Sequence, residues 1–411
     1  MKVAALGWIA AAAVLALAFA VSPNFRWSEA PRPSPYAGDF LHEYVGGWMV
    51  REAGPARLYD VARFSAAQHD AELVGFTWPR EQFFQALHPP FYYQWVAPLS
   101  RLDYRSAAHL WAVLGVAALI ASVVLLGRSD ARMRAWVGPA LALCVLYTPV
   151  AETLVSGQKS TFLLLLFAAT YVLLARGRPA LAGAVFGLVA LKPQLLLVVA
   201  VAMLAKREWR FVAGMAATGV VLAAQSLLLG FDACAGWLDA ITHPLPQREL
   251  ALRAHSWLGF AQLLLGENRG AAVVGLTAAL GLATALVLAR VLRGPFAYGS
   301  PRFRIQFAAM VLATPLVSPY LYKTYDLAIF VVPLFLLARE WLDLPAERTT
   351  LRRVWLVSWL AVFAMGGASA AIAERIPVQF SALASFALLL MLGSSPWLAE
   401  PQTKPAATTA R

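Results

Sequence analysis

Long apolar segments separated by short polar segments run through most of the sequence. We predict that twelve of them cross a membrane as helices, because each carries few charges and most are long enough to span about 30 Å of hydrocarbon. A further apolar segment, residues 257–265, is predicted to lie at the membrane interface. The predicted crossings are residues 3–21, 106–126, 136–152, 161–175, 180–191, 195–205, 211–229, 271–289, 303–317, 327–337, 355–373 and 378–392.

Composition and charge support this interpretation. The chain is 60% hydrophobic and 14% charged, with a mean hydropathy of +0.64, which excludes an ordinary soluble domain. The net charge of +12 does not indicate a nucleic-acid partner, because the basic residues form short clusters between apolar segments. Such clusters are typical of cytoplasmic loops. We therefore predict an all-α polytopic membrane protein with both termini in the cytoplasm.

The N-terminal segment has two interpretations. Residues 18–20 read Ala-Phe-Ala, which resembles the cleavage site of a secretory signal peptide. However, the apolar run of residues 3–21 is longer than an ordinary signal core and long enough to cross a bilayer. We expect a retained first transmembrane helix.

A long polar interruption, residues 22–105, follows the first helix directly. It holds nine of the chain's 22 carboxylates. We predict that it is a large periplasmic loop of short amphipathic helices and that it carries the chemistry. The whole chain, residues 1–411, is then a single membrane domain, with a bundle over residues 106–395 and a cytoplasmic tail over residues 396–411.

Asp39, His42 and Glu43 stand at positions i, i+3 and i+4 near the start of this loop. On a short helix they share one face, beside an apolar stripe that includes Tyr44. We expect this helix to rest on the membrane surface and to present its carboxylates to a site above it. A carboxylate there can take a proton from an attacking hydroxyl. The alternative is that Asp39 only caps the helix.

Lys192 is flanked by apolar sequence and precedes Pro193, where we predict a break in the helix. The lysine either holds an anion or snorkels to the interface. Other polar residues fall on the same predicted side, and together they offer positive charge to a lipid phosphate or to ordinary headgroups. These residues are Gln158, Lys159, Tyr320, Lys323, Tyr325 and Asp326, with Arg248 and Arg253 of the predicted outer loop 230–256.

The order of short motifs along the chain resembles glycosyltransferase family 87 of the GT-C superfamily. This family is similar to α-mannosyltransferases that extend phosphatidylinositol mannosides. The resemblance covers residues 39–333 and rests on the order of its motifs rather than on any one of them. The motifs are DFxxxY at 39–44, LYD at 58–60, PPF at 89–91, GQ at 157–158, GRPALAG at 177–183, GLVALKPQ at 187–194 and SPYLYxxYD at 318–326.

The resemblance implies a hexosyltransferase of the bacterial inner membrane that builds cell-envelope glycolipid. A polyprenyl-phosphate sugar, mannose-like, is the implied donor, and a lipid or glycan is the acceptor at the periplasmic face. Asp39 matches the general base of an inverting mechanism, His42 or Glu43 would tune its pKa, and the lysines would stabilise the departing phosphate. The resemblance implies no nucleotide sugar, no metal and no other cofactor.

Because of two departures from the family pattern, the resemblance does not identify the acceptor or the residues that bind the phosphate. His88 stands where the family has a tyrosine before the PPF motif, and it is a candidate hydrogen-bond donor to a phosphate or a second acid–base group. Tyr325 and Asp326 replace a Ser-Trp-x-His element.

Other functions remain alternatives at this stage. A lipid-linked-sugar flippase or transporter would show an internal repeat, and a surface-polysaccharide polymerase or ligase would place its large loop late in the chain. A purely structural membrane subunit is a further alternative.

Overall fold

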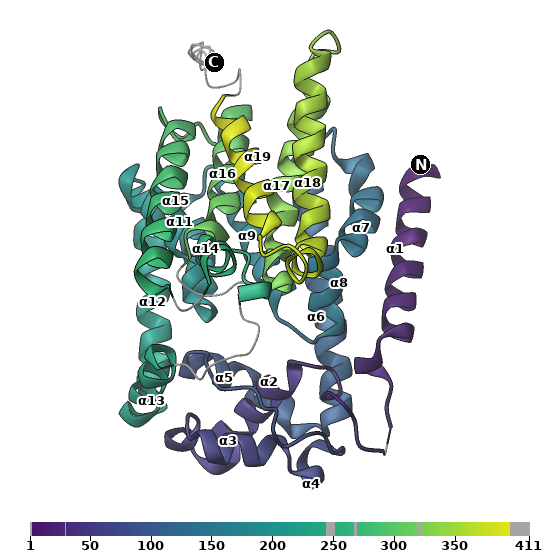
Figure 1. Cartoon of the computed structure of the whole chain (residues 1–411), viewed down its shortest axis with the longest axis vertical. Coiled ribbons are helices and arrows are strands. Elements are labelled where there is room, and N and C mark those ends of the chain that lie inside the picture. The colour runs from purple at the N-terminus through teal and green to yellow at the C-terminus, as the bar shows by residue number, and fades with distance from the viewer. Residues whose placement is uncertain (1, 29, 244–250, 267–268, 319–322, 395–411) are drawn as a thin grey trace, which may run out of the picture.

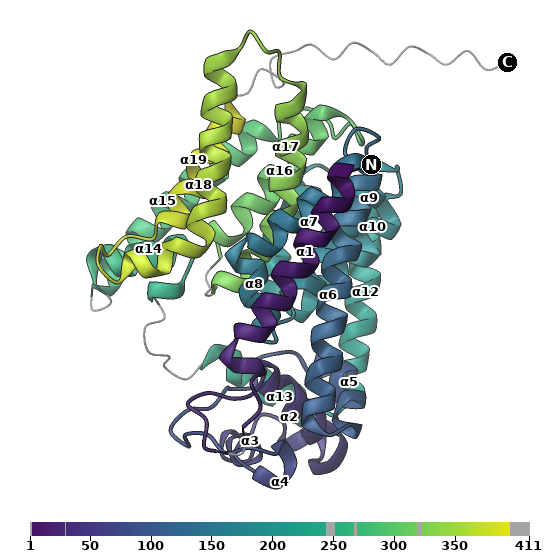
Figure 2. The same ribbon diagram turned by 90° about the vertical axis from the view of Figure 1, so that its right-hand side faces the viewer.

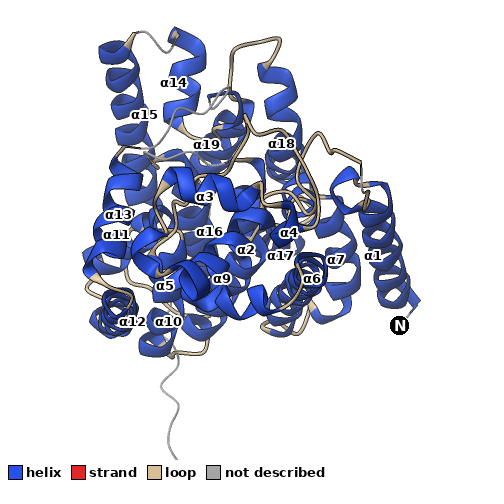
Figure 3. Cartoon of the chain, turned by 90° about the horizontal axis from the view of Figure 1, so that it is seen from below, coloured by secondary structure: helices blue, strands red, loops and turns tan. Residues whose placement is uncertain are grey.

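The computed structural model describes residues 2–28, 30–243, 251–266, 269–318 and 323–394, and this part of the chain consists of helices and loops without a strand. Seen from below, in Figure 3, helices fill the whole cross-section. In chain order they are α1 (Lys2–Val21), α2 (Phe40–Trp48), α3 (Val61–Gln68), α4 (Ala71–Val74), α5 (Pro90–Val96), α6 (Tyr104–Arg128), α7 (Val137–Leu146), α8 (Thr148–Val155), α9 (Ser160–Ala175), α10 (Pro179–Gly187), α11 (Leu197–Ala205), α12 (Trp209–Leu228), α13 (Phe231–Thr242), α14 (Trp257–Leu265), α15 (Gly270–Val291), α16 (Pro301–Leu316), α17 (Val331–Asp343), α18 (Thr349–Ala373) and α19 (Phe380–Gly393).

Several of these helices meet the requirements for crossing a membrane. Among the described residues, α6, α12, α15 and α18 are each long and apolar enough, and α7 with α8 forms a bent fifth candidate. In the apolar window of α15 only 11% of the residues are buried, so most of that helix faces outward. An apolar surface of this size is stable only against lipid. The chain is therefore a multi-pass membrane protein, as predicted, while the number of twelve crossings stays a prediction.

The bundle has two different ends (Figures 1 and 2). The short helices α2 to α5 gather at one end, and α1 begins at the other. Between the ends, α1 packs on α7, α6 on α9, α10 on α12, α16 on α17 and α18 on α19. The predicted sequence of short helices within residues 22–105 is confirmed; the side of the membrane on which they lie stays a prediction.

The position of α2 differs from the prediction of a helix resting on the membrane surface. Every residue from Phe40 to Gly47 is buried, and α2 contacts α3, α5 and α6. Two glycines permit this burial. A Cβ atom on Gly46 would lie 2.1 Å from the Tyr93 ring, and one on Gly47 would lie 2.9 Å from the Ala97 backbone. The close approach of α5 thus depends on glycine, and the polar side chains of α2 are enclosed.

The predicted break at Lys192 is confirmed. The α-helical backbone of α10 ends at Gly187, 3₁₀ turns follow on both sides of Lys192, and Lys192 itself has φ −131° and ψ 82°. Pro193 has no amide hydrogen to continue the helix. The change of direction leaves Lys192 between two helical segments, with its side chain free to point into the bundle.

Two predicted crossings have wrong boundaries. Residues 136–152, predicted as one straight crossing, are α7 and α8 at 71°, because Tyr147 is extended and Pro149 starts a new helix. Residues 327–337 are not one helix, since a 3₁₀ turn over Thr324–Phe330 precedes α17. The predicted loop 230–256 contains α13.

Candidate active site

Asp39 stands at the first position before α2, but its side chain does not cap that helix. No backbone amide of α2 donates to the carboxylate. Instead, the Gln158 side-chain amide donates a hydrogen bond to Asp39 Oδ2. Asp39 is half-buried, whereas its neighbours Gly38 and Phe40 are buried. Its carboxylate is thus oriented by another side chain and still accessible.

Two turns that contact each other, one before α2 and one before α9, hold Asp39 next to Gln158. The backbone amide of Asp39 donates to the Ser156 carbonyl at 2.9 Å. Gly157 has φ +64°, and a Cβ atom there would lie 2.4 Å from the Ala37 carbonyl oxygen. The Trp111 indole donates to the Gly157 carbonyl at 2.8 Å. The short distance between the turns is therefore possible only with glycine at position 157.

Glu43 is fully buried one turn further along α2 and forms an ion pair with Lys159. Lys159 precedes α9 and also lies over the Tyr92 ring, with its Nζ atom 5.0 Å from the ring centroid. His42 donates from Nδ1 to the Asp39 carbonyl at 2.6 Å, and its Nε2 lies 3.3 Å from Glu43 Oε1. The predicted neighbours Asp39, His42 and Glu43 are thus joined to Lys159 in one network.

His88 completes this network from the chain before α5. Its Nε2 atom lies 3.9 Å from Glu43 Oε1, and its carbonyl accepts a hydrogen bond from the Tyr59 hydroxyl at 2.5 Å. Burial, and then the nearby Lys159 ammonium, lower the pKa of His88 well below its usual value. Burial likewise lowers the pKa of His42. Burial thus favours the neutral form of both imidazoles.

His42, Glu43 and His88 are the group of described residues that is able to hold a metal ion. Their ligand atoms lie within 4.8 Å of one another. Neutral imidazole and carboxylate are suitable ligands for zinc and similar ions. The Lys159 ammonium contacts the same Glu43 oxygen, however, so a cation there would have to displace it.

A second buried ion pair joins Lys192 to Asp326. The Ser160 hydroxyl donates to the same Asp326 oxygen at 3.2 Å, at the start of α9. The free amides of a helix N-terminus favour an anion, and here the protein's own carboxylate lies at that position. Tyr325 lies beside the pair, 5.2 Å from Lys192 Nζ to the ring centroid, and its hydroxyl interacts with Asp39. This contact connects the second ion pair to the Asp39 network.

Comparison with known proteins assigns the family. The family model of glycosyltransferase family 87 matches residues 86–319, more than half of the chain. The chain belongs to glycosyltransferase family 87. No curated protein sequence matches it. A similar solved structure is that of ArnT from Cupriavidus metallidurans in the apo state, with 15% identity, a TM-score of 0.45 and coverage of 95% of this chain and 77% of that one.

Membership in family 87 confirms the family resemblance seen in the sequence, and with the apolar helices it makes the protein a membrane glycosyltransferase. The matched region contains His88, Gln158, Lys159 and Lys192. Asp39, His42 and Glu43 precede it, and Lys323, Tyr325 and Asp326 follow it. The roles of all these residues stay predictions.

Glu152 is a further candidate site residue, which the sequence interpretation missed. It lies half-buried on α8, and Arg253, Asp39, Asp326 and Lys323 all act on it electrostatically. It falls within the predicted apolar crossing 136–152. A carboxylate at the end of an apolar helix was the available signal, because such a group is costly in a membrane and usually has a partner.

The remaining predicted residues fall into three groups. Lys323 is half-buried, with Nζ 5.9 Å from the Tyr325 ring centroid, and Arg253 is exposed. Tyr44 is buried, and its hydroxyl donates to the Leu102 carbonyl at 2.8 Å, which anchors α2 to the chain before α6. Tyr320 and Arg248 lie outside the described residues.

Proposed function

We propose that this family 87 enzyme transfers a hexosyl group, mannose-like, from a polyprenyl-phosphate donor to a lipid or glycan acceptor with inversion at the anomeric carbon. The observation that carries the proposal is the Asp39 carboxylate, which is half-buried and oriented by Gln158 next to a cluster of buried charges. Family membership supports the reaction class. The donor, the acceptor and the stereochemistry are the proposed part.

Asp39 is the proposed general base. Gln158 donates to Oδ2, the Tyr325 hydroxyl also interacts with this carboxylate, and we assign acceptance of the proton to Oδ1. As the hydroxyl oxygen forms its bond to the anomeric carbon, its proton passes to Asp39, and the bond from that carbon to the phosphate oxygen breaks. The electron pair of that bond leaves with the polyprenyl phosphate. The reaction written in this way requires neither a redox partner nor a nucleotide.

The departing phosphate needs cations that are not already neutralised. Lys159 and Lys192, the sequence candidates, are each paired with a buried carboxylate. Lys323 and Arg253 are more accessible, and both act on Glu152 near Asp39. We assign the phosphate contact to Lys323 and Arg253. Lys159 and Lys192 then contribute by fixing the geometry and the potential of the site.

The orientation follows from the same proposal. Twelve crossings would place the helices α2 to α5 and the Asp39 site on the periplasmic side of the inner membrane, with both chain termini in the cytoplasm. The distribution of basic clusters in the sequence supports this orientation. The donor's lipid tail would then lie in the outer leaflet of that membrane.

The test is release of polyprenyl phosphate by the purified protein from a panel of radiolabelled polyprenyl-phosphate sugars, with a lipid extract as acceptor source. We expect release with one sugar and transfer of its label into the extract. Asp39→Asn should remain folded and lose transfer, because an amide cannot accept the proton. Asp60→Asn is the matched control, since Asp60 caps α3 and otherwise forms only an exposed ion pair with Arg63, and asparagine caps equally well. Turnover of Asp39→Asn at the wild-type rate would remove Asp39 from the mechanism.

A further inference from the structure

A cavity rich in arginine lies at the end of the bundle opposite the short helices α2 to α5. Its volume is about 270 Å³, and it is bounded by the last residues of α6 and α9, the middle of α17 and the first turn of α16. Four arginines line it, with Asp130 as the one carboxylate in the lining. They are Arg128, Arg176, Arg304 and Arg339.

Only two of these arginines are neutralised by ion pairs. Arg339 contacts Asp130, with Nε 2.7 Å from Oδ2, and also pairs with Asp343. Arg304 pairs with Glu340. Arg128 and Arg176 have no ion-pair partner among the described residues, and both are exposed at the mouth of the cavity. The cavity therefore has a positive charge that the described part of the protein does not compensate.

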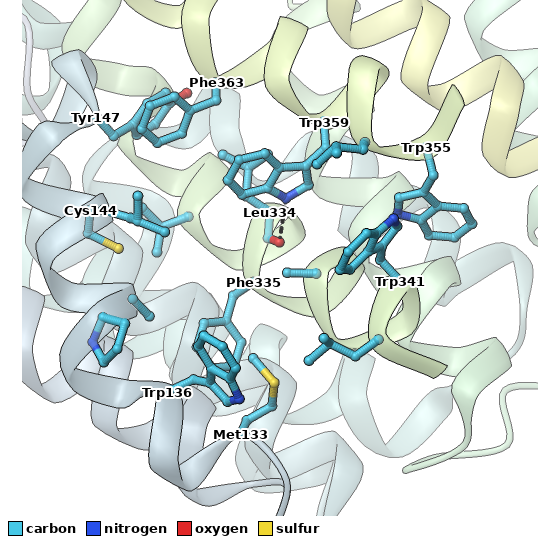
Figure 4. Close-up of a pocket in the computed structure, with 17 residues that line it drawn as sticks. Met133, Trp136, Cys144, Tyr147, Leu334, Phe335, Trp341, Trp355, Trp359 and Phe363 are labelled. Atoms are coloured by element: carbon cyan, nitrogen blue, oxygen red, sulfur yellow. Dashed lines mark hydrogen bonds between the residues drawn. The ribbon is translucent and has the colours of Figure 1, made fainter. Parts of the chain in front are cut away.

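An apolar groove adjoins this cavity. Its volume is about 290 Å³, and its walls come from α7, α17 and α18 together with the chain before α7 (Figure 4). Trp136, Trp341 and Trp359 are among the residues that line it. Met133 and Phe335 line both the groove and the arginine cavity, so the two spaces meet at these side chains. Met133 has a flexible side chain that is able to move aside for a ligand.

We propose that the cavity and the groove together bind one anionic glycerophospholipid of the leaflet opposite the Asp39 site. The lipid phosphate lies among the arginines, where guanidinium groups match its oxygens and its charge. One acyl chain passes Met133 and Phe335 into the groove. The positive charge of the arginine cavity favours an anionic headgroup. Because the cavity opens directly into the apolar groove, a lipid with an acyl chain fits better than a free anion.

The site is separate from the proposed reaction centre. Asp39 lies at the α2 to α5 end of the molecule, and the arginines lie at the other end of the bundle (Figure 1). The bound lipid would connect α6, α9, α16 and α17 with α7 and α18 across the groove. Its function would be to hold these helices together, independently of the identity of the transferred sugar.

The test compares detergent-purified wild-type protein with the double variant Arg128→Gln/Arg176→Gln in binding and thermal-shift measurements with phosphatidylglycerol. Each arginine near an anionic lipid contributes about fivefold in affinity, so the double variant should bind on the order of 20-fold more weakly. Neither arginine has an ion pair to lose, so the variant should fold. Arg210→Gln is the matched control, because Arg210 is an exposed arginine of α12 outside the cavity lining.

Measurements with other ligands and a further variant distinguish between the possible occupants of the site. Phosphatidylcholine and inorganic phosphate should give a much smaller stabilisation than phosphatidylglycerol. Met133→Trp, which fills the junction, should weaken binding of a long-chain phosphatidylglycerol but not of its dihexanoyl form. Equal effects of all lipids, an equal effect of inorganic phosphate, or displacement of phosphatidylglycerol by an equimolar polyprenyl phosphate would each overturn the proposal.

Discussion

Gln158 donates a hydrogen bond to the Asp39 carboxylate although 119 positions separate the two residues. If Asp39 is the base, this bond fixes the direction of its other oxygen, Oδ1. Gln158→Leu should then lower kcat by about 100-fold, the typical effect of misplacing a reacting group by 1 Å, and leave KM nearly unchanged. Initial-rate kinetics with the polyprenyl-phosphate donor measure both constants. An unchanged kcat would show that Asp39 needs no such orientation.

Gly157 should tolerate no side chain. In Gly157→Ala the new Cβ atom would lie 2.4 Å from the Ala37 oxygen and 2.6 Å from Phe40 Cβ, at φ +64°. The turn strain alone costs about 1 to 3 kcal/mol, and the clash adds to it. Gly177→Ala is the control, because its φ is +68° but nothing lies within 4 Å of its Cβ position. Thermal unfolding in detergent should therefore separate the two variants, with Gly157→Ala clearly less stable.

The Lys192–Asp326 pair should show strong coupling in a double-mutant cycle. Both side chains are buried, with 8% and 4% exposure. Lys192→Met leaves Asp326 charged without its partner and should destabilise the protein by about 3 to 5 kcal/mol. Lys192→Met/Asp326→Leu removes both charges and should recover most of that loss. Arg51→Met, which breaks the exposed Arg51–Glu52 pair, should change stability by less than about 1 kcal/mol. Additive effects of the two single substitutions at 192 and 326 would contradict the pairing.

Stability should fall with acidification because of His255. Its ring contacts Ser381 Oγ at 2.6 Å and Thr324 Oγ1 at 3.1 Å, and burial lowers its pKa from 6.5 to about 3. Between these two values the unfolded chain binds a proton that the folded chain does not. The stabilisation is therefore complete above pH 6.5 and is lost as the pH falls toward 3, by about 2 kcal/mol between pH 7 and 5.

Thermal unfolding of wild type and His255→Gln at pH 7 and pH 5 measures this loss. The variant should be less stable at pH 7 but should lose less on acidification. An equal loss in both proteins would assign the pH dependence to other groups.

The sequence was sufficient for those features that depend on local pattern. Apolar length predicted the membrane class, and Pro193 predicted the break beside Lys192. The predictions failed where tertiary packing determines the position or direction of a helix. The two glycines of α2 allow α5 to cover a helix that the apolar stripe placed at the surface. The bend at Tyr147 lies within an apolar segment whose hydropathy continues across it.

In the candidate site, too, the residue types were predictable from the sequence but their packing was not. Asp39, Glu43, Lys159, Lys192 and Asp326 were all identified as residue types suited to the chemistry. Their pairing was not predictable, because Glu43 and Lys159 are separated by 116 positions and meet only when the turn before α9 contacts the start of α2. Two lysines expected to face a phosphate therefore proved to face carboxylates. Glu152 was missed because its partners come from three other segments.

The separation of Lys192 from Asp326 also has a consequence for biosynthesis. The two residues are 134 positions apart. At a synthesis rate of about 5 to 20 residues per second, Lys192 leaves the ribosome roughly 7 to 27 s before its partner. During that interval the nascent chain carries an unpaired cation in an otherwise apolar segment. Stable insertion of this part of the bundle therefore has to wait for the segment that carries Asp326, and an early stop in translation would leave a product recognisable to quality-control proteases.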